Sequence, residues 1–366
     1  MPVGGVTYDR SIDTSESLDL LRITQEDYPW KGELTVLTER HKFPVMNQWF
    51  QKHRVIQKSG DSIAEIVIID ENGSAQFVEP YEEQTLDVPD VTAKIMLPWR
   101  RLRAHYSFED TEIAMNRDPS RLMDLLDARR APAELSMANK LEDRAWEAPT
   151  STSDKKNPHG IPYWFVPITS AQVAAATRGH QGANASGFSD VAGIDASATA
   201  NALWRSYNDV WTNGDKEMTE DDVQKVVRML RHLQFDVPVI ATDWTEGKYA
   251  NFTLNTTEDM LDNIEIKARE NNDSLGADLS KYSGRVMFKG TVVQWNEDLD
   301  DETTNPLVAI NHDYFCPVVM EGNYFREIKA MNDRKQPQVF TSYIFLMFNF
   351  ILKNRRMGGG RIDWVT

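Results

Sequence analysis

The chain has 366 residues, of which 41% are hydrophobic and 26% are charged, so it can bury a substantial core spread over about two compact lobes. Its formal net charge of −16 argues against a sequence-reading DNA binder, because an acidic surface repels phosphates. The single cysteine, Cys316, excludes an intrachain disulfide and a cysteine-based zinc site, and its apolar surroundings favour a buried small hydrophobe over a nucleophile.

No basic start followed by an apolar run is present at the N-terminus, so no secretory signal is predicted. The longest apolar stretch, residues 344–352, is too short to span a bilayer and is better interpreted as a buried strand. We therefore expect a protein that is made in the cytoplasm and has no membrane partner.

Residues 1–50 are predicted to form an N-terminal arm. Its first part is polar, and its second part carries aromatic side chains with little periodicity, among them Trp30, Trp49 and Phe50. Aromatic residues on an extended segment fit two interpretations: docking onto another surface, or burial in the chain's own core.

Residues 51–98 are predicted to form a long β-hairpin. Apolar side chains alternate from Ile63 to Ile69, the pair Asn72-Gly73 is a strong hairpin-turn signal, and the chain returns through Val91–Leu97. A charged hairpin of this length has little core of its own, and isolated hairpins are marginal in water. We therefore expect it to lie against a partner.

A long helix is predicted to begin at Asp118-Pro119, because Asp caps free N–H groups and Pro fits the first turn. It continues to about Ala148, with Ala133, Met137, Leu141 and Ala145 on one face and a kink or split at Pro132. At 1.5 Å per residue such a spine is roughly 40 Å long.

The segment 149–202 is rich in small and polar residues and is expected to form loops around one apolar strand, Tyr163–Ile168. Thr219–Asp222 then caps an amphipathic helix that buries Val223, Val226, Val227 and Leu230. The later elements are expected to be a strand at Val237–Ala241, a helix at Asp259–Glu270, and strands at Arg285–Trp295, Leu307–Asn311, Tyr314–Met320 and Val339–Leu352.

No catalytic motif is found: phosphate loop, HExxH, GxSxG and paired CxxC are all absent, and the seven histidines never fall at i, i+3 or i+4. The acidic run Glu297–Glu302 is the best candidate for a metal ligand set, although solvated acidic loops are much more common. Gly358–Gly360 is interpreted as a flexible turn before the last strand. No catalytic, cofactor-binding or metal-binding residue is predicted, and no cofactor.

A dense basic patch surrounds Trp99 and comprises Arg100, Arg101 and Arg103. It suits contact with nucleic acid or contact with the acidic hairpin and arm across an interface. The interface is favoured, because the chain is acidic overall.

In this order, the elements resemble the Hong Kong 97-type fold of tailed-bacteriophage major capsid proteins. The sequence segments that carry the resemblance follow one another as in that family: Val91-Thr92-Ala93 with Pro98-Trp99-Arg100, then Glu112 and Asn116; Gly193–Ser197 with Leu203–Ser206; Pro238–Ala241; and Asn305–Asn311, Gln336–Val339 and Arg355–Gly358 near the end. They span roughly residues 45–362.

The resemblance implies an α+β capsid fold with five parts: an N-arm (1–50), an extended E-loop hairpin (51–98), a P-domain with a long spine helix (99–150), an A-domain (151–310), and closing strands that return to the P-domain and A-domain (311–366). No fused helical scaffolding extension precedes the arm, so a separate scaffolding protein is expected. Some relatives crosslink an E-loop lysine to a P-domain asparagine; Lys58 is present here, but no motif identifies an asparagine partner, so crosslinking is not carried over.

The implied function is structural rather than enzymatic. The chain is expected to be a virion shell subunit that forms pentamers and hexamers around double-stranded DNA, in passive contact with that DNA, with a scaffolding protein and a portal as further partners and assembly in the host cytoplasm. The alternatives are an encapsulin-like nanocompartment shell, or a metal-dependent hydrolase that uses residues 297–302. The expected assembly interface includes Trp30, Trp49, Phe50, Lys58, Asn72, Gly73, Trp99, Arg100, Arg101 and Arg103.

Overall fold

The structure is a computed structural model that describes residues 40–71, 73, 75, 77–80, 90–115, 119–169, 178–212, 218–234, 251–270, 286–288, 290–332 and 337–365. The chain divides into two compact units. Of the described residues, the small unit contains those in Leu102–Ala138 and Phe325–Leu346, and the large unit contains those in Arg40–Arg101, Asn139–Tyr324 and Met347–Thr366. In the described part, no helix combines the length and the apolar character needed to cross a membrane.

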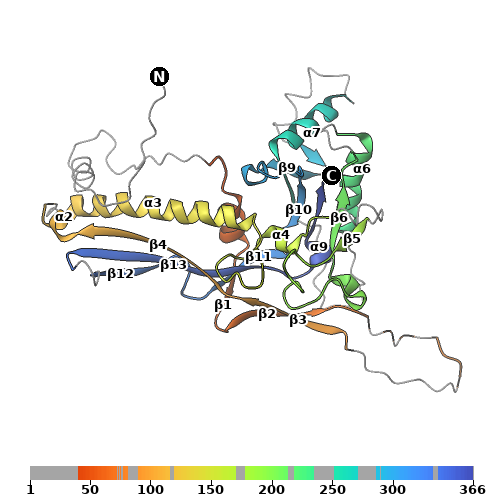
Figure 1. Ribbon diagram of the computed structural model, residues 1–366, viewed down its shortest axis with the longest axis horizontal. Coiled ribbons are helices and arrows are strands. Elements are labelled where there is room, and N and C mark those ends of the chain that lie inside the picture. Colours follow the sequence, from red (N-terminus) through yellow and green to blue (C-terminus); the bar gives the residue numbers. More distant parts are fainter. Residues whose placement is uncertain are drawn as a thin grey trace. The chain divides into compact units, whose positions relative to one another are not determined.

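Three paired strands and a long helix dominate the small unit (Figure 1). Strand β12 (Arg326–Asn332) pairs antiparallel with the first part of β13 (Val339–Leu352), and β4 (Arg100–Glu109) also pairs with β13. After β4 come the short helix α2 (Asp110–Met115) and the long helix α3 (Pro119–Ala145). Arg129 of α3 donates to the Ser107 carbonyl at 2.6 Å and forms two hydrogen bonds with Glu112, which ties the helix to β4 and α2.

The predicted long helix is confirmed as α3, although its cap Asp118 lies outside the described residues. Met137, Leu141 and Ala145 are buried as expected, and Ala133 is half-buried. The expected split at Pro132 is wrong, because α3 continues through it. A proline removes only its own N–H donor, and the 27-residue helix retains the hydrogen bonds on either side.

A seven-stranded sheet forms the large unit, in the order β5 (Gly179–Gly182), β6 (Ser206–Val210), β14 (Gly359–Asp363), β10 (Leu307–Asn311), β7 (Phe252–Thr256), β9 (Thr291–Trp295) and β8 (Met287–Phe288). Helices α6 (Glu220–His232) and α7 (Glu258–Glu270) share one core with the sheet. That core includes Val226, Met229, Met260, Leu254 and Ala309.

Helix α6 confirms its sequence signal. The Thr219 hydroxyl accepts from the Asp222 amide, and the Asp222 carboxylate accepts from the Thr219 amide, which is a complete capping box. Val226 and Leu230 are buried, and Val223 packs against the same core. The predicted helix at Asp259–Glu270 is also present, as α7.

Two strand predictions are wrong. Tyr163–Ile168 is not a strand: Gly160 and Pro162 start a short helix, α4 (Ile161–Trp164), and the apolar residues that follow are buried without strand pairing. The segment Arg285–Trp295 is interrupted by Gly290 at φ 82°, which separates β8 from β9. The predicted strand Val237–Ala241 lies outside the described residues.

The glycine run near the C-terminus is also not a turn. Gly358 ends the short helix α9 (Arg355–Gly358), and Gly359 and Gly360 begin β14, between β10 and β6. A Cβ on Gly359 would lie 2.2 Å from the Ala309 carbonyl oxygen and 2.8 Å from the Phe165 ring. Glycine is needed here because the neighbouring backbone approaches so closely.

The predicted hairpin is present as β2 (Ser62–Ile68) and β3 (Thr92–Pro98), which pair antiparallel with Ile63 opposite Leu97. Among the described residues the pairing stops at Ile69 and Val91, so the pair Asn72-Gly73 does not directly join two paired strands. Asn72 lies outside the described residues, and Gly73 has φ 62°. Nearby, β1 (Val55–Gln57) pairs in parallel with β11 (Phe315–Met320), which pairs with the end of β13.

Candidate assembly surfaces

The β2–β3 hairpin has one buried face. Ile63, Ile95 and Leu97 are at most 2% exposed, and the Met96 amide donates to the Ala192 carbonyl at 2.9 Å. The expectation that the whole hairpin lacks support from its own chain is therefore only half right, because this face packs within the large unit.

The opposite face of the hairpin is exposed and carries an apolar row along β2, with Lys94 and Thr92 of β3 beside it. Ile66, Ile68 and Met96 are 74%, 64% and 52% exposed, and alternation along paired strands places them on the same side together with Ala64. Phe77 and Val78, in the connection between the strands, are also exposed. We call Ala64, Ile66, Ile68 and Met96 the hairpin stripe. A contiguous exposed apolar surface of this kind indicates a site of association.

A second open surface lies on the small unit and mixes aromatic and basic side chains. Arg103 of β4 is exposed and sits 5.7 Å from the centroid of the Tyr343 ring, and His105 lies 6.1 Å from the same ring. Ile328 and Arg326 stand opposite Tyr343 and Phe345 in the β12–β13 ladder, so they share that face. We call this surface the β4–β13 face.

The structure divides the predicted basic patch. Arg101 and Arg103 are exposed on alternate positions of β4. Arg100 is 7% exposed and donates to the carbonyl oxygens of Lys155 and Asp154 at 2.8 and 2.9 Å, so its assignment to an interface is wrong. Trp99 is half-buried, and its indole N–H donates to the Gly60 carbonyl.

The aromatic residues of the predicted arm are a further correction. Trp49 and Phe50 are at most 1% exposed and lie in η1 (Val45–Phe50), so they cannot contact another copy. The Trp49 indole donates to His312 Nδ1 at 2.9 Å and packs edge-on against Phe315 and Phe350. Lys58 and Gly73 are exposed, whereas Trp30 lies outside the described residues.

Residues 40–50 are held on the C-terminal end of α3 by buried charge, which sequence patterns did not reveal. Glu142 is fully buried and accepts from the Val45 and Met46 amides at 3.0 and 2.9 Å, at the start of η1. Burial raises the pKa of Glu142 to about 7, although the two amides and the Arg40 charge oppose that rise. We call this contact the Glu142 cap.

The acidic loop, proposed as a metal site, is occupied by basic and amide groups of the same chain. Arg40 donates to both Asp298 oxygens at 2.6 and 2.9 Å and pairs with Asp143, and Glu302 pairs with Arg361. Asp300 accepts from the Glu258 amide and the Trp295 indole. In the described ranges no group of three or more metal-ligating side chains could hold an ion. Cys316 is buried, as expected, and burial raises its pKa to about 11.

Arg355 is a fully buried cation that pairs with no carboxylate in the part of the chain that the structure describes. Its guanidinium donates to the carbonyl oxygens of Trp164, Trp204, Gly182 and Ala183 at 2.9 to 3.3 Å. Burial lowers its pKa to about 9, so it remains charged at neutral pH. This carbonyl cage joins α9 to the last residue of α4, to the end of β5 and to Trp204, the last residue of a short 3-10 helix.

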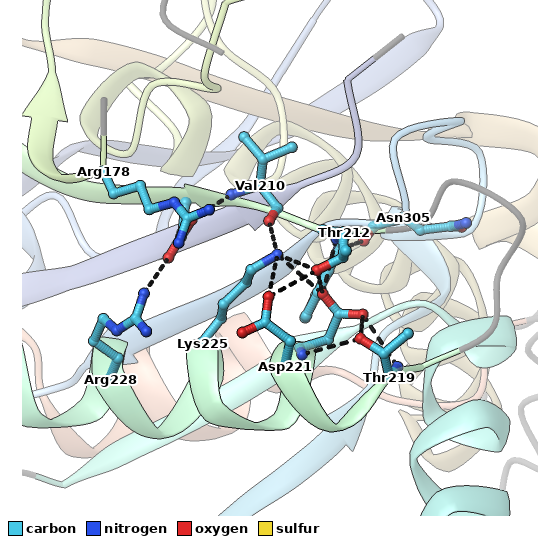
Figure 2. A network of polar contacts seen from close by, with 11 residues as sticks. Arg178, Val210, Thr212, Thr219, Asp221, Lys225, Arg228 and Asn305 are labelled. Carbon is cyan, nitrogen blue, oxygen red and sulfur yellow. Dashed lines mark hydrogen bonds and ion pairs between the residues drawn. The ribbon is translucent and has the colours of Figure 1, made fainter. Parts of the chain in front are cut away.

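Figure 2 shows a polar network between α6 and the end of β6. The buried Lys225 ammonium donates to the Val210 carbonyl at 2.8 Å, contacts the Thr212 hydroxyl, and pairs with Asp222 at 3.2 Å. Beside it, Arg178 and Arg228 both approach Asp209. The network fastens the polar side of α6 to the sheet.

Comparison with solved structures finds capsid chains that align with nearly the whole of this chain. The chain of the Cyanophage A-1(L) capsid asymmetric unit aligns with a TM-score of 0.57 and 14% identity over 94% of this chain and 96% of the other. The capsid of the native GTA particle aligns with a TM-score of 0.55 and 11% identity, over 93% of this chain and 95% of the other. The capsid of Myoviridae Phage XM1 aligns with a TM-score of 0.52 and 9% identity, over 98% of this chain and 100% of the other.

The chain has the fold of a phage capsid protein. No family model and no curated protein matches the sequence, so this capsid fold is recognised through structure. The mixture of helix and sheet that the sequence predicted is confirmed at this level. Identities of 9–14% do not carry over individual residues, so any role for the hairpin stripe or the β4–β13 face rests on the geometry of this chain.

Proposed function

We propose that this chain is the major subunit of a tailed-bacteriophage head, assembling into the pentamers and hexamers of an icosahedral shell that encloses double-stranded DNA. The observation that carries the proposal is the structural likeness to several capsid chains over more than nine-tenths of both partners. Its role is structural and not enzymatic, in keeping with those capsid neighbours.

Within the proposal, the parts of the chain take the roles of the Hong Kong 97-type fold. Residues 1–50 are the N-arm, 51–98 the E-loop, 99–150 the P-domain with α3 as its spine helix, 151–310 the A-domain, and 311–366 the closing strands. The paired strands β2 and β3 and the 27-residue α3 support this division.

Assembly would bury the surfaces that the single chain leaves open. The hairpin stripe exposes apolar side chains, whose burial gains roughly 25 cal/mol per Å². Two exposed acids that follow β2, Asp70 and Glu71, complement Arg101 and Arg103 on β4 of a neighbouring copy. Lys58 and Gly73 belong to the same proposed interface. Rings form because each contact joins two different surfaces.

The further partners in this proposal are a scaffolding protein, a portal, and packaged DNA in passive contact with the inner wall. The net charge of −16 supports weak attachment to DNA. The site of action is the virion, after assembly in the host cytoplasm.

The proposal is tested by co-expressing the chain with its neighbouring genes and imaging the products by electron microscopy. Closed particles with clusters of five and six subunits are expected. A chain that stays monomeric at all concentrations, with and without the co-expressed proteins, would contradict it.

The content of the same particles distinguishes a phage head from an encapsulin-like compartment, which shares this fold. Nuclease-protected DNA inside supports the head, and a protein cargo supports the compartment. Metal analysis combined with Asp298→Ala tests the hydrolase alternative, which the engagement of Asp298 by Arg40 argues against.

A further inference from the structure

Asp209 lies near the edge of the seven-stranded sheet with an arginine on each side. Asp209 is on β6 and is 1% exposed. The β5–β6 ladder pairs Gly179 with Asn208, so the preceding residue, Arg178, lies opposite Asp209. Arg228 approaches from α6 (Figure 2). Arg178 Nε is 3.9 Å from Asp209 Oδ1, and Arg228 Nη1 is 4.0 Å from Oδ2.

Both guanidinium groups keep their hydrogen-bonding capacity. The distances of 3.9 and 4.0 Å are ion-pair distances, beyond the range of a hydrogen bond. Neither guanidinium donates a hydrogen bond to any residue that the structure describes, and the side chains are 55% and 37% exposed. Two cations share one carboxylate, so the site keeps a net charge of about +1 on an acidic chain.

The floor of the site holds two further polar groups. Asp209 Oδ2 and the Tyr207 hydroxyl are buried and form no hydrogen bond of ordinary geometry with any described residue, and the two side chains lie close enough for the Asp209 carboxylate to act on the Tyr207 hydroxyl. The Tyr207 ring is stacked on His232 at 5.5 Å and is 0% exposed. Burial, together with the nearby Asp209 charge, raises the pKa of Tyr207, which keeps its hydroxyl protonated and able to donate.

We propose that Arg178 and Arg228 receive a carboxylate side chain from a second copy of this chain. The two guanidinium groups beside the buried Asp209 present several N–H donors, which suits bidentate recognition of a carboxylate. The Tyr207 hydroxyl and Asp209 Oδ2 anchor a water beneath it, because a water needs such polar partners. This contact would be one of the interfaces between subunits of the proposed shell, so the inference rests on that proposed function.

The occupant follows from charge. The chain has 56 acidic and 40 basic residues, so a neighbouring copy brings many carboxylates to any contact. On α7, Glu258 and Asp262 are exposed, and no described residue pairs with either carboxylate. Helix α7 packs near β9 and helix α6 packs near β6, toward opposite ends of the sheet. A contact between α7 of one copy and α6 of the next would therefore join two different surfaces, as a closed ring requires.

A DNA phosphate is the rival occupant, and the observations favour it less. Asp209 leaves only about one net positive charge, whereas nucleic-acid contact draws on several cations that are free to neutralise phosphates. The net charge of −16 repels a polyanion such as DNA. A single carboxylate on a second copy is influenced mainly by the two arginines next to it.

The first experiment measures assembly of the full chain, with its co-expressed partners, as a function of concentration and salt. Arg178→Ala/Arg228→Ala should raise the concentration needed for shell formation at least tenfold and weaken its salt dependence, because charge-assisted hydrogen bonds are lost from every contact. The control is Arg231→Ala, an exposed arginine in the same helix, which should assemble as the wild type does. An unchanged assembly curve for the double variant would overturn the inference while leaving the shell function intact.

The second experiment identifies the occupant. In particles of Arg228→Lys treated with a carbodiimide, mass spectrometry should find an amide between the introduced amine and a carboxylate of another copy, and isotope-mixed particles show whether the link is intermolecular. Intramolecular links alone would overturn the inference. So would a double variant that builds normal empty shells but loses packaged DNA, because that result assigns the arginines to phosphate.

Discussion

At the scale of single residues, Arg355 shows how one buried cation can organise several loops. Its guanidinium satisfies the carbonyl oxygens of Trp164, Trp204, Gly182 and Ala183. Arg355→Ala should lower the free energy of unfolding by at least about 3 kcal/mol, because it leaves these groups unpaired in the interior. Denaturant unfolding of the subunit measures this. The exposed control Arg231→Ala should change stability by less than about 0.5 kcal/mol, and an equal effect of both would contradict the cage.

The burial of the Glu142 carboxyl group predicts a dependence on pH. The pKa of Glu142 in the folded chain, about 7, lies above its unfolded value of 4.5, so the folded state binds the proton more tightly. Its stabilisation is therefore full below pH 4.5 and is lost as pH rises through 7, by roughly 3 kcal/mol in total.

Glu142→Gln removes this titration. The difference in unfolding free energy between wild type and variant should change between pH 5 and pH 8, in favour of the variant at the higher pH. Glu134→Gln is the matched control, because Glu134 sits on the same helix, pairs with Arg130 and is 46% exposed. A pH dependence equal in wild type and Glu142→Gln would rule out the cap as its source.

At the scale of elements, the β2–β3 hairpin separates folding from assembly. Ile66→Thr/Ile68→Thr changes the exposed face and should leave subunit stability within about 0.5 kcal/mol of the wild type, yet reduce shell formation. Ile95→Ala, on the buried face of the same hairpin, should cost about 2–4 kcal/mol of subunit stability. Thermal unfolding and particle yield distinguish the two. Normal yield from the exposed-face variant would remove the hairpin stripe from the interface.

Helices and strands whose causes lie within their own sequence segment could be predicted. The α6 capping box and the bounds of β10 and β13 agree with their sequence patterns, because cap chemistry and long apolar runs act locally. The strand start at Gly359-Gly360 was missed, since its cause is the close approach of the Ala309 carbonyl from a distant strand. The strand prediction for Tyr163–Ile168 was wrong for a related reason: the apolar residues are buried, but burial alone does not supply a neighbouring strand to pair with.

The candidate surfaces were harder to predict, because a residue type does not reveal which way its side chain faces. Trp49 and Arg100 are an anchoring aromatic and a cation in the sequence, yet both are buried by their own chain. Arg101 and Arg103 differ from Arg100 only in the alternation of β4. Ionic contacts between distant segments, such as Arg40 with Asp298, leave no mark in the sequence pattern.

At the scale of the whole molecule, the proposed function makes the chain one subunit of a closed shell. Its capsid fold, its exposed hairpin stripe and its high net charge agree with a subunit that stays soluble until complementary surfaces meet.

The most direct test is a side-chain-resolution electron cryomicroscopy reconstruction of the particles formed by this chain. The account predicts an icosahedral lattice of fivefold and sixfold clusters in which a neighbouring copy covers Ile66, Ile68 and Met96. A reconstruction in which this face stays in solvent, or a preparation that yields no closed lattice, would contradict the central claim.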